Sequence, residues 1–176
     1  MGKGKQIKRT LLVQTKGRED KAWCHVLKQH FADTDLISVT LDPGIGGSPV
    51  DIVRAAINKK NLFSSSYDHV VALVDGDYPE DLESAKRLAR DNNIELFVIA
   101  PRMEALLLNI LEPEYFWYST DVGHKDYFEH TYIKPDERIR SSRYEKVLSL
   151  EAILTSSQTD AQLMRLIELM RGENWG

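Results

Sequence analysis

The amino-acid sequence predicts an α/β fold in which a mostly parallel sheet of four or more strands carries helices on both faces. Short apolar runs rich in branched side chains alternate with helical patterns of about ten to fifteen residues, and this alternation implies crossover connections between parallel strands. At 176 residues, with 42% hydrophobic and 28% charged positions, the chain has the size and composition of one globular domain with a substantial core.

Four segments are predicted as strands. RTLLVQT is a short run of apolar and branched residues, and DLISVTLD alternates as a half-buried strand does. YDHVVALVD and IELFVIA are nearly continuous apolar runs, typical of a sheet that is covered on both faces. In chain order, the predicted strands are 9–15, 35–42, 67–75 and 94–100.

A helical pattern follows each predicted strand. Behind the first strand, one helical face carries Ala22, Trp23, Val26, Leu27 and His30. The segment 49–60 reads as a helix with Ser48 as its N-cap, and 79–93 as a helix with acids early and bases late, as the helix dipole favours. A further helix is predicted from residue 101 onward.

Two more helices are predicted near the C-terminal end, at 143–157 and 159–173. The second has Thr159 as its cap and an apolar stripe on one side. Residues 112–146 are aromatic and polar without a clear period, so no element is predicted for most of that segment.

We divide the chain into three parts on these patterns. Residues 1–8 form a basic flexible terminus, residues 9–112 the α/β core, and residues 113–176 a largely helical extension. The extension is expected to pack on the core or on a partner chain.

Charge is distributed unevenly along the chain. The formal net charge is −4, yet the first thirty residues contain only two acids, Glu19 and Asp20, against eight bases: Lys3, Lys5, Lys8, Arg9, Lys16, Arg18, Lys21 and Lys28. This asymmetry fits either an anion-binding end or a solvated terminus. The mild overall acidity argues against strong non-specific binding of duplex nucleic acid, which depends on many Lys and Arg contacts to phosphate.

Cysteine content and hydropathy favour a cytoplasmic location. Cys24 is the only cysteine, so an intrachain disulfide is excluded, and no secretion signal is recognisable at the amino end. No apolar stretch approaches the roughly 20 residues that a membrane helix needs. We therefore expect a soluble protein without a membrane partner.

The stretch VALVDGDYPED places two aspartates, Asp75 and Asp77, at the end of the third predicted strand. The carboxyl ends of parallel strands face the crevice where α/β proteins bind ligands, and residues i and i+2 of an extended chain project the same way. Two neighbouring carboxylates repel unless a cation lies between them. Because hard divalent cations prefer oxygen ligands, the pair predicts a site for Mg²⁺ or Mn²⁺.

A simpler interpretation of the same stretch stays open. Asp75-Gly76-Asp77 can be an ordinary turn into the helix at 79–93, with Asp77, Glu80 or Asp81 capping that helix. Turn chemistry accounts for Asp77 better than for Asp75, which belongs to the apolar run.

Residues 9–112 resemble the RloB-like branch of the Toprim superfamily. The resemblance rests on RTLLVQTKGREDKAWCHVL, GGSPVDIVRAAI, YDHVVALVDGDYPEDLESAKRLARDNNIELFVIAP and RMEALLLNIL, taken in that order. In that family a strand ends in a glutamate-glycine pair, a later strand ends in Asp-x-Asp, and a further strand leads into a proline and a helix. The matching positions here are Asp75 and Asp77, Pro101, and the helix start at 103–108.

The resemblance implies a Toprim-like fold and metal-dependent cleavage of phosphodiester bonds in DNA or RNA, of the kind found in phage defence or mobile elements. Asp75 and Asp77 would hold Mg²⁺ or Mn²⁺. Glu104 follows the fourth strand and is an additional catalytic candidate; as an acid in the first turn of a helix, it equally suits a purely dipole-stabilising role. A homo-oligomer is a further possibility.

One departure from the family pattern affects the expected activity. Thr15 and Lys16 stand where the family has glutamate and glycine, and Gly17 comes one place late. Glu19 or Asp20 can match a following acid of the family, so we expect either that Glu19 takes the acid–base role or that Lys16 neutralises phosphate. The alternative hypothesis is a catalytically inactive module that binds a partner protein or nucleic acid.

Three other features receive weaker predictions. The glycines of the loop DPGIGGSPVD let backbone amides approach an anion, or form an ordinary connection. Arg102 is a candidate phosphate contact. His124 and His130 do not have the spacing of helical metal ligands, so we expect them to be structural.

Overall fold

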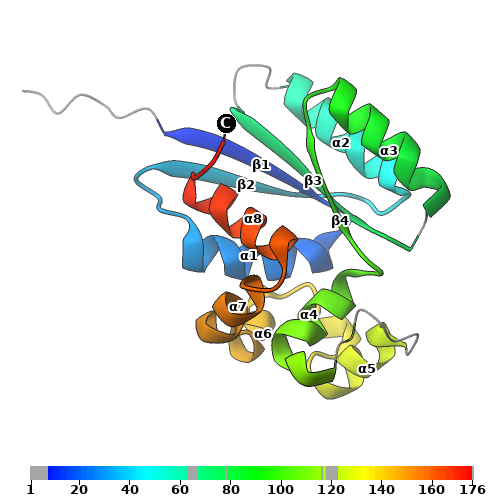
Figure 1. Cartoon of the computed structure of the whole chain (residues 1–176), viewed down its shortest axis with the longest axis vertical. Helices are drawn as coiled ribbons and strands as arrows, with labels where there is room; N and C mark the ends of the chain where they lie inside the picture. The colour runs from blue at the N-terminus through cyan, green and yellow to red at the C-terminus, as the bar shows by residue number, and fades with distance from the viewer. Residues whose placement is uncertain (1–7, 63–66, 78, 116, 118–122, 176) are drawn as a thin grey trace, which may run out of the picture.

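The computed structural model describes residues 8–62, 67–77, 79–115, 117, 123–175 of the chain. Its centre is a four-stranded sheet with the order β2-β1-β3-β4, in which every neighbouring pair is parallel. The strands are β1 (Arg9–Thr15), β2 (Ile37–Pro43), β3 (His69–Asp75) and β4 (Glu95–Ile99). The predicted fold class, a mostly parallel sheet with helices on both faces, is confirmed (Figure 1).

Alternate residues of the strands enter two separate apolar clusters. Leu11 and Val13 of β1 face one cluster, and Leu12 between them faces the other. This is the period of two expected of a strand. Both faces of the sheet are therefore buried, which explains why β1 and β3 read as continuous apolar runs.

Helices cover the two faces in different numbers. One face carries α2 (Pro49–Leu62) and α3 (Pro79–Asp91), which pack against each other and complete the smaller apolar cluster. The other face carries α1 (Arg18–Phe31) and α8 (Ala161–Arg171), which lie side by side (Figure 1).

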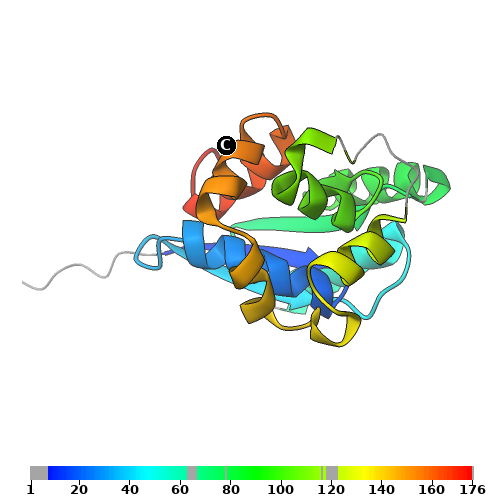
Figure 2. The ribbon, with the colours of Figure 1, turned by 90° about the horizontal axis from the view of Figure 1, so that it is seen from below.

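The remaining helices extend the larger apolar cluster on the side of the sheet that carries α1 and α8 (Figure 1). They are α4 (Met103–Leu111), α5 (His124–Thr131), α6 (Ser141–Val147) and α7 (Leu150–Ser157), with short 3₁₀ turns η1 (Pro113–Tyr115) and η3 (Pro135–Glu137). Figure 2 looks at this side and shows these helices and α1 in front of the sheet. The segments after residue 112 thus share one core with α1 and the strands.

Several local predictions need correction. The helix expected at 143–157 is two helices, because the chain leaves the α-conformation at Leu148 and the Ser149 side chain accepts a hydrogen bond from the amide of Ala152, starting α7. The cap of α8 is Asp160, whose carboxylate accepts from the amide of Leu163, rather than Thr159.

The inner face of α1 also differs from the prediction at its C-terminal end. His30 is exposed, and Phe31 is the buried residue of the last turn. Of the predicted flexible terminus, residues 1–7 lie outside the described residues, and Lys8 is exposed. Within the described part of the chain, every helix is too short or too polar to cross a bilayer.

Candidate functional site

The strand order fixes where a ligand site is expected in this sheet. From β1 the chain moves outward to β2 and then crosses to β3 on the other side of β1, so the direction of winding changes between β1 and β3. Ligands of open α/β sheets bind in the crevice outside the carboxyl ends of the strands at such a point. A cavity of about 660 Å³ lies there, lined by the β1–α1 and β2–α2 loops, the end of β3, the start of α4 and the segment after η3.

The five residues predicted from the sequence as catalytic or metal-binding all line this one cavity: Lys16, Glu19, Asp75, Asp77 and Glu104. They come from three separate parts of the chain, which the parallel sheet brings to the same edge.

Asp75 is held at the crevice between a lysine and a helix start. Its Oδ2 lies 3.0 Å from Nζ of Lys16, and its Oδ1 accepts a hydrogen bond of 3.1 Å from the amide of Met103, the first residue of α4. Burial raises the pKa of the Asp75 carboxyl, and the contacts with Lys16 and Met103 oppose that rise. The same ion pair outweighs burial at Lys16 and raises the pKa of the ammonium, so Lys16 stays charged.

Asp77 faces a different cation. Its Oδ2 lies 3.5 Å from Nη2 of Arg102, and its Oδ1 is buried without a hydrogen-bond partner among the described residues. Asp75 and Asp77 therefore line the same cavity, but each carboxylate is already next to a basic side chain.

Arg138 is a site residue that the sequence did not reveal. Its side chain is 2% exposed and forms ion pairs with Glu19 at 3.0 Å and Glu129 at 2.7 Å, and also with Glu104. The charges of these acids raise its pKa against the effect of burial. Arg138 stood within a mixed basic and acidic run, IKPDERIRSSRYEK, which gives no sign of where its side chain points.

Asp20 is the acid in the cavity that is best suited to exchange a proton near neutral pH. Burial of its carboxyl, reinforced by the charges of Asp75 and Glu104, raises the pKa of Asp20 to about 7. Its Oδ2 accepts a hydrogen bond of 3.2 Å from the amide of Gly17, which fixes the carboxyl at the first turn of α1.

Thr15 occupies a different environment from that of the neighbouring Lys16. Thr15 is fully buried, and its hydroxyl donates to the carbonyl oxygens of Gly17 at 3.0 Å and Asp42 at 3.3 Å. Lys16 is the residue whose side chain enters the cavity. A glutamate introduced at position 15 would therefore be buried away from the site, while one at position 16 would face Asp75.

The glycine-rich loop between β2 and α2 forms one wall of the cavity. The amide of Gly44 donates to the carbonyl of Thr15 at 2.8 Å, and the amide of Gly46 donates to the carbonyl of Lys16 at 2.9 Å. Ser48 lies next to the amide of Asp51, with its hydroxyl 3.4 Å away, in the predicted capping position of α2.

Asp75 and Asp77 can hold a divalent cation only if other ligands, such as water, complete its coordination. Within the described residues, no group of three or more His, Cys, Asp or Glu side chains is placed to hold a metal ion. Asp77 nevertheless lines the cavity, and one of its carboxylate oxygens is buried without a hydrogen-bond partner among the described residues. Mg²⁺ commonly binds one or two carboxylates and keeps several waters, so Asp75 and Asp77 fit that pattern.

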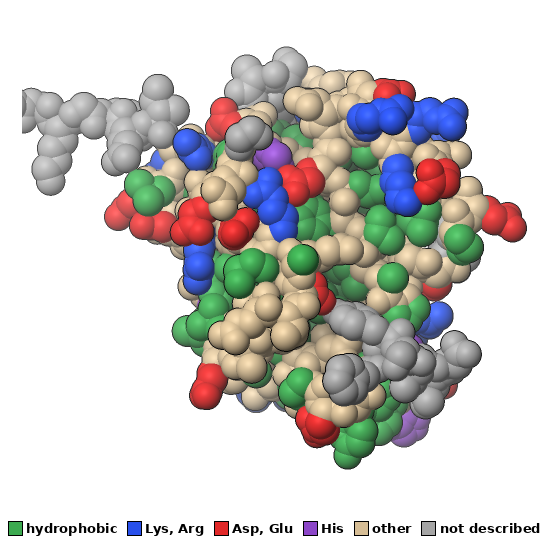
Figure 3. Space-filling model, in the orientation of Figure 1, with side chains coloured by type: hydrophobic (Ala, Val, Ile, Leu, Met, Phe, Trp, Pro, Cys, Tyr) green, Lys and Arg blue, Asp and Glu red, His purple; other side chains and the backbone are tan. Residues whose placement is uncertain are grey.

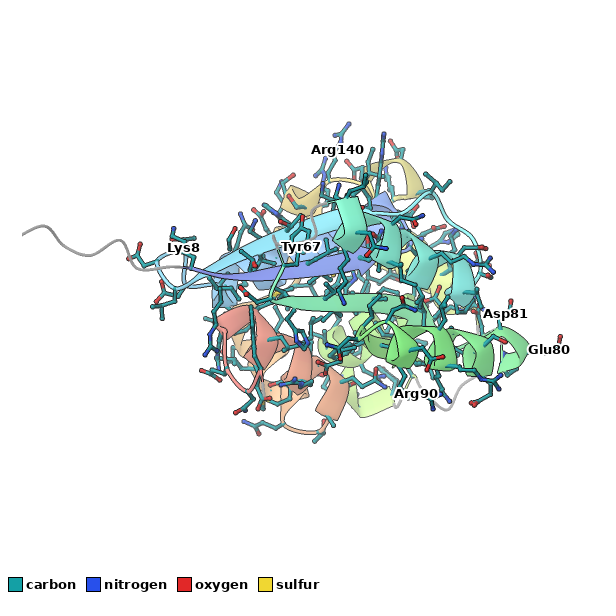
Figure 4. The ribbon with its side chains drawn as sticks, turned by 90° about the horizontal axis from the view of Figure 1, so that it is seen from above. Lys8, Tyr67, Glu80, Asp81, Arg90 and Arg140 are labelled. Atoms are coloured by element: carbon teal, nitrogen blue, oxygen red, sulfur yellow. The ribbon has the colours of Figure 1, made fainter. Side chains whose placement is uncertain are left out.

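Lys8, the described basic residue that precedes β1, is not part of the site. In Figure 4, Lys8 at the start of β1 lies at the opposite end of the sheet from Glu80 and Asp81, which begin α3 beyond the carboxyl end of β3. The basic side chain that precedes β1 is therefore remote from Asp75. Figure 3 shows basic and acidic side chains interspersed over another face of the protein.

The two histidines and the cysteine have other surroundings. His124 is buried, with Nε2 2.7 Å from the carbonyl oxygen of Trp117, and His130 bonds to the carbonyl of Asp126 within its own helix. Cys24 is fully buried in α1, and this burial raises the pKa of its thiol well above the usual value.

Comparisons of this chain with protein-family models, with curated proteins and with solved structures gave no match.

Proposed function

We propose that this chain is a Toprim-like, metal-dependent phosphodiesterase that cleaves nucleic acid at the β1/β3 crevice and acts in phage defence or mobile-element biology. The observation that supports the proposal most directly is that two ion pairs, Lys16–Asp75 and Arg102–Asp77, line one cavity at the point of the sheet where α/β proteins bind ligands. It extends the sequence resemblance with a cavity of suitable size and chemistry.

The charge balance of the cavity suits a phosphate that arrives with a cation. Among the described residues that line it, five are acidic and five are basic: Glu19, Asp20, Asp75, Asp77 and Glu104, against Lys16, Arg18, Arg102, Lys125 and Arg138. A formally neutral site gains little from a phosphate alone, whereas a divalent cation at the aspartates would give it net positive charge.

Asp75 and Asp77 are the residues that would hold Mg²⁺ or Mn²⁺. When bound, such an ion supplies Lewis-acid polarisation of a phosphoryl oxygen and lowers the pKa of a coordinated water. Lys16 and Arg102 flank the two carboxylates and suit contacts to non-bridging phosphate oxygens, Arg102 with a planar guanidinium and Lys16 as a point charge.

Asp20 and Glu19 have different roles in this proposal. A group with a pKa near the working pH is the most effective general acid or base, which favours Asp20, with its pKa of about 7, as the proton carrier. Glu19 is 41% exposed and shares Arg138 with the more deeply buried Glu104. We assign Glu19 and Glu104 to positioning Arg138 at the cavity wall.

Cleavage assays with aspartate variants test the proposal. The protein is incubated with Mn²⁺ or Mg²⁺ and with labelled single-stranded, duplex and transfer RNA or DNA. Metal-dependent cleavage is expected, with loss of at least about 100-fold when Asp75→Asn and Asp77→Asn are combined. Asp91→Asn, an exposed aspartate on α3, is the matched control and should cleave normally. Cleavage that survives the double substitution would refute this assignment.

A second function has one specific observation in its favour. The ammonium of Lys16 already neutralises Asp75 at 3.0 Å, as a bound metal would, which suits a catalytically inactive module that binds nucleic acid or a partner protein. Lys16→Glu separates the two functions, because position 16 faces the cavity. Metal-dependent cleavage that appears only in Lys16→Glu supports the inactive module, and cleavage by the unmodified chain rules it out.

A further inference from the structure

Two exposed isoleucines stand at the charged cavity. Ile45 of the β2–α2 loop is fully exposed, and Ile139, which follows η3, is 52% exposed; both line the cavity that contains Asp75. A single exposed apolar side chain is ordinary in a protein surface. Two exposed aliphatic side chains from distant parts of the chain line one cavity together with ten charged residues, which indicates a ligand with an apolar surface next to its charge.

The backbone on both sides of Ile45 is hydrogen-bonded to the end of β1. The amides on either side, those of Gly44 and Gly46, both donate to carbonyls at the end of β1, at 2.8 and 2.9 Å. A Cβ at position 44 would come within 2.8 Å of two of these carbonyl oxygens, so only glycine permits this close approach. With both hydrogen bonds formed, the Ile45 side chain is fully exposed.

Ile139 is anchored in a comparable way. The residue before it, Arg138, is buried in three ion pairs, and the amide of the residue after it, Arg140, donates to the carbonyl of Glu137 at 3.0 Å. Figure 4 shows the side chain of Arg140 extending away from the sheet. An exposed cation thus follows directly after the isoleucine in the chain.

We propose that the occupant of this cavity is single-stranded DNA or RNA, with one unpaired base packed against Ile45 and Ile139 while its phosphate lies at the charged floor. The proposal rests on the function proposed above and names its substrate class. A duplex keeps its base faces stacked, whereas an unpaired base offers both faces to apolar side chains. The cavity of about 660 Å³ is in the range of small-ligand sites and suits one or two nucleotides.

Binding measurements without turnover test this inference. Fluorescence anisotropy is recorded in Ca²⁺ with labelled 12-nucleotide probes: single-stranded DNA, single-stranded RNA, the corresponding duplexes, and a single strand with abasic sites. We expect single strands to bind at least about tenfold more tightly than duplexes, and the abasic strand to lose about fivefold or more relative to the intact one. The DNA and RNA arms decide which single strand is preferred.

Serine substitutions locate the apolar contact. Ile45→Ser and Ile139→Ser should each weaken binding of the intact single strand by about fivefold or more, while binding of the abasic strand stays unchanged. Leu36→Ser, an exposed leucine just before β2, is the matched control and should bind normally. Because all three side chains are exposed, the melting temperatures should agree within a few degrees.

Equal or tighter binding of duplex, or isoleucine variants that bind the single strand as the unmodified protein does, would overturn the inference. These outcomes are distinguishable from a failure of the proposed function. Absence of metal-dependent cleavage removes the phosphodiesterase but leaves single-strand binding in Ca²⁺ intact, whereas cleavage of duplex alone removes only the substrate class inferred from Ile45 and Ile139.

Discussion

Arg138→Met keeps an unbranched side chain in the core but removes the positive charge that pairs with three glutamates. In the folded protein, Arg138 is 2% exposed, and the side chains of Glu104 and Glu129 are 11% and 13% exposed. Glu19 is 41% exposed and can be solvated by water instead. The variant therefore leaves two carboxylates poorly solvated and without their main partner.

The size of the effect follows from that burial. Removing one member of a buried ion pair costs about 3–5 kcal/mol, because the remaining charge stays desolvated. Glu129 retains Lys125 at 3.8 Å, so most of the loss comes from Glu104. We expect a decrease of about 3–4 kcal/mol in the free energy of unfolding, equivalent to a fall of roughly 10 °C in melting temperature for a domain of this length.

Urea denaturation followed by circular dichroism measures this change. Arg140→Met, at an exposed arginine two residues away, is the matched control and should lose less than about 0.5 kcal/mol. Adding Glu104→Gln to Arg138→Met removes the uncompensated charge and should recover part of the loss. A loss below about 1 kcal/mol for Arg138→Met, or no recovery in the double variant, would refute the reasoning.

Three further outcomes are expected for parts of the fold around the site. Burial acts to raise the pKa of Glu95, but hydrogen bonds with His69 and Arg165 lower it to about 2, below the usual 4.5. This carboxylate therefore stabilises the fold above pH 4.5 and loses that effect as the pH falls toward 2. Glu95→Gln should lower the free energy of unfolding by about 1–2 kcal/mol at pH 7. In a pH series of urea titrations, this loss of stability should shrink below pH 4.5, and a loss that stays constant would contradict the reasoning. Gly44→Ala places a Cβ 2.7 Å from a backbone oxygen and should lower the stability measured by thermal unfolding by about 2 kcal/mol or more. Gly17→Ala, whose Cβ would meet nothing within 4 Å, should lower it by at most about 1 kcal/mol. Equal losses of stability in the two variants would contradict the close approach at Gly44. Asp160→Ala should cost about 1 kcal/mol through loss of the α8 cap, and Thr159→Ala less, a ranking that the reverse result in urea titrations would disprove.

The strands could be predicted closely because burial on both faces leaves a continuous apolar signal in the chain. The predicted strand 9–15 coincides with β1 (Arg9–Thr15), and the prediction for 67–75 ends at the same residue as β3 (His69–Asp75). The break between α6 and α7 escaped prediction because the apolar pattern continues across it: Leu148, where the helix is interrupted, is itself 1% exposed.

The site was predictable only where chain order alone brings residues to one edge of the sheet. Asp75 follows a recognisable strand, and the fold class is enough to place it at the crevice. Arg138 meets Glu104 across 34 positions of sequence, a pairing that no local pattern encodes. The choice between Thr15 and Lys16 depends on the last residue of a strand, where a shift by one position turns a side chain from core to cavity.

Because α8 is made after the segments on which it packs, part of the core stays uncovered in the nascent chain. α8 (Ala161–Arg171) is made long after α1 and β2, yet it lies against both and contributes Leu166, Ile167 and Met170 to the larger apolar cluster. Until those residues leave the ribosome, the side of α1 that they cover is open to water, and a prematurely terminated chain would present it to chaperones or to other copies of itself.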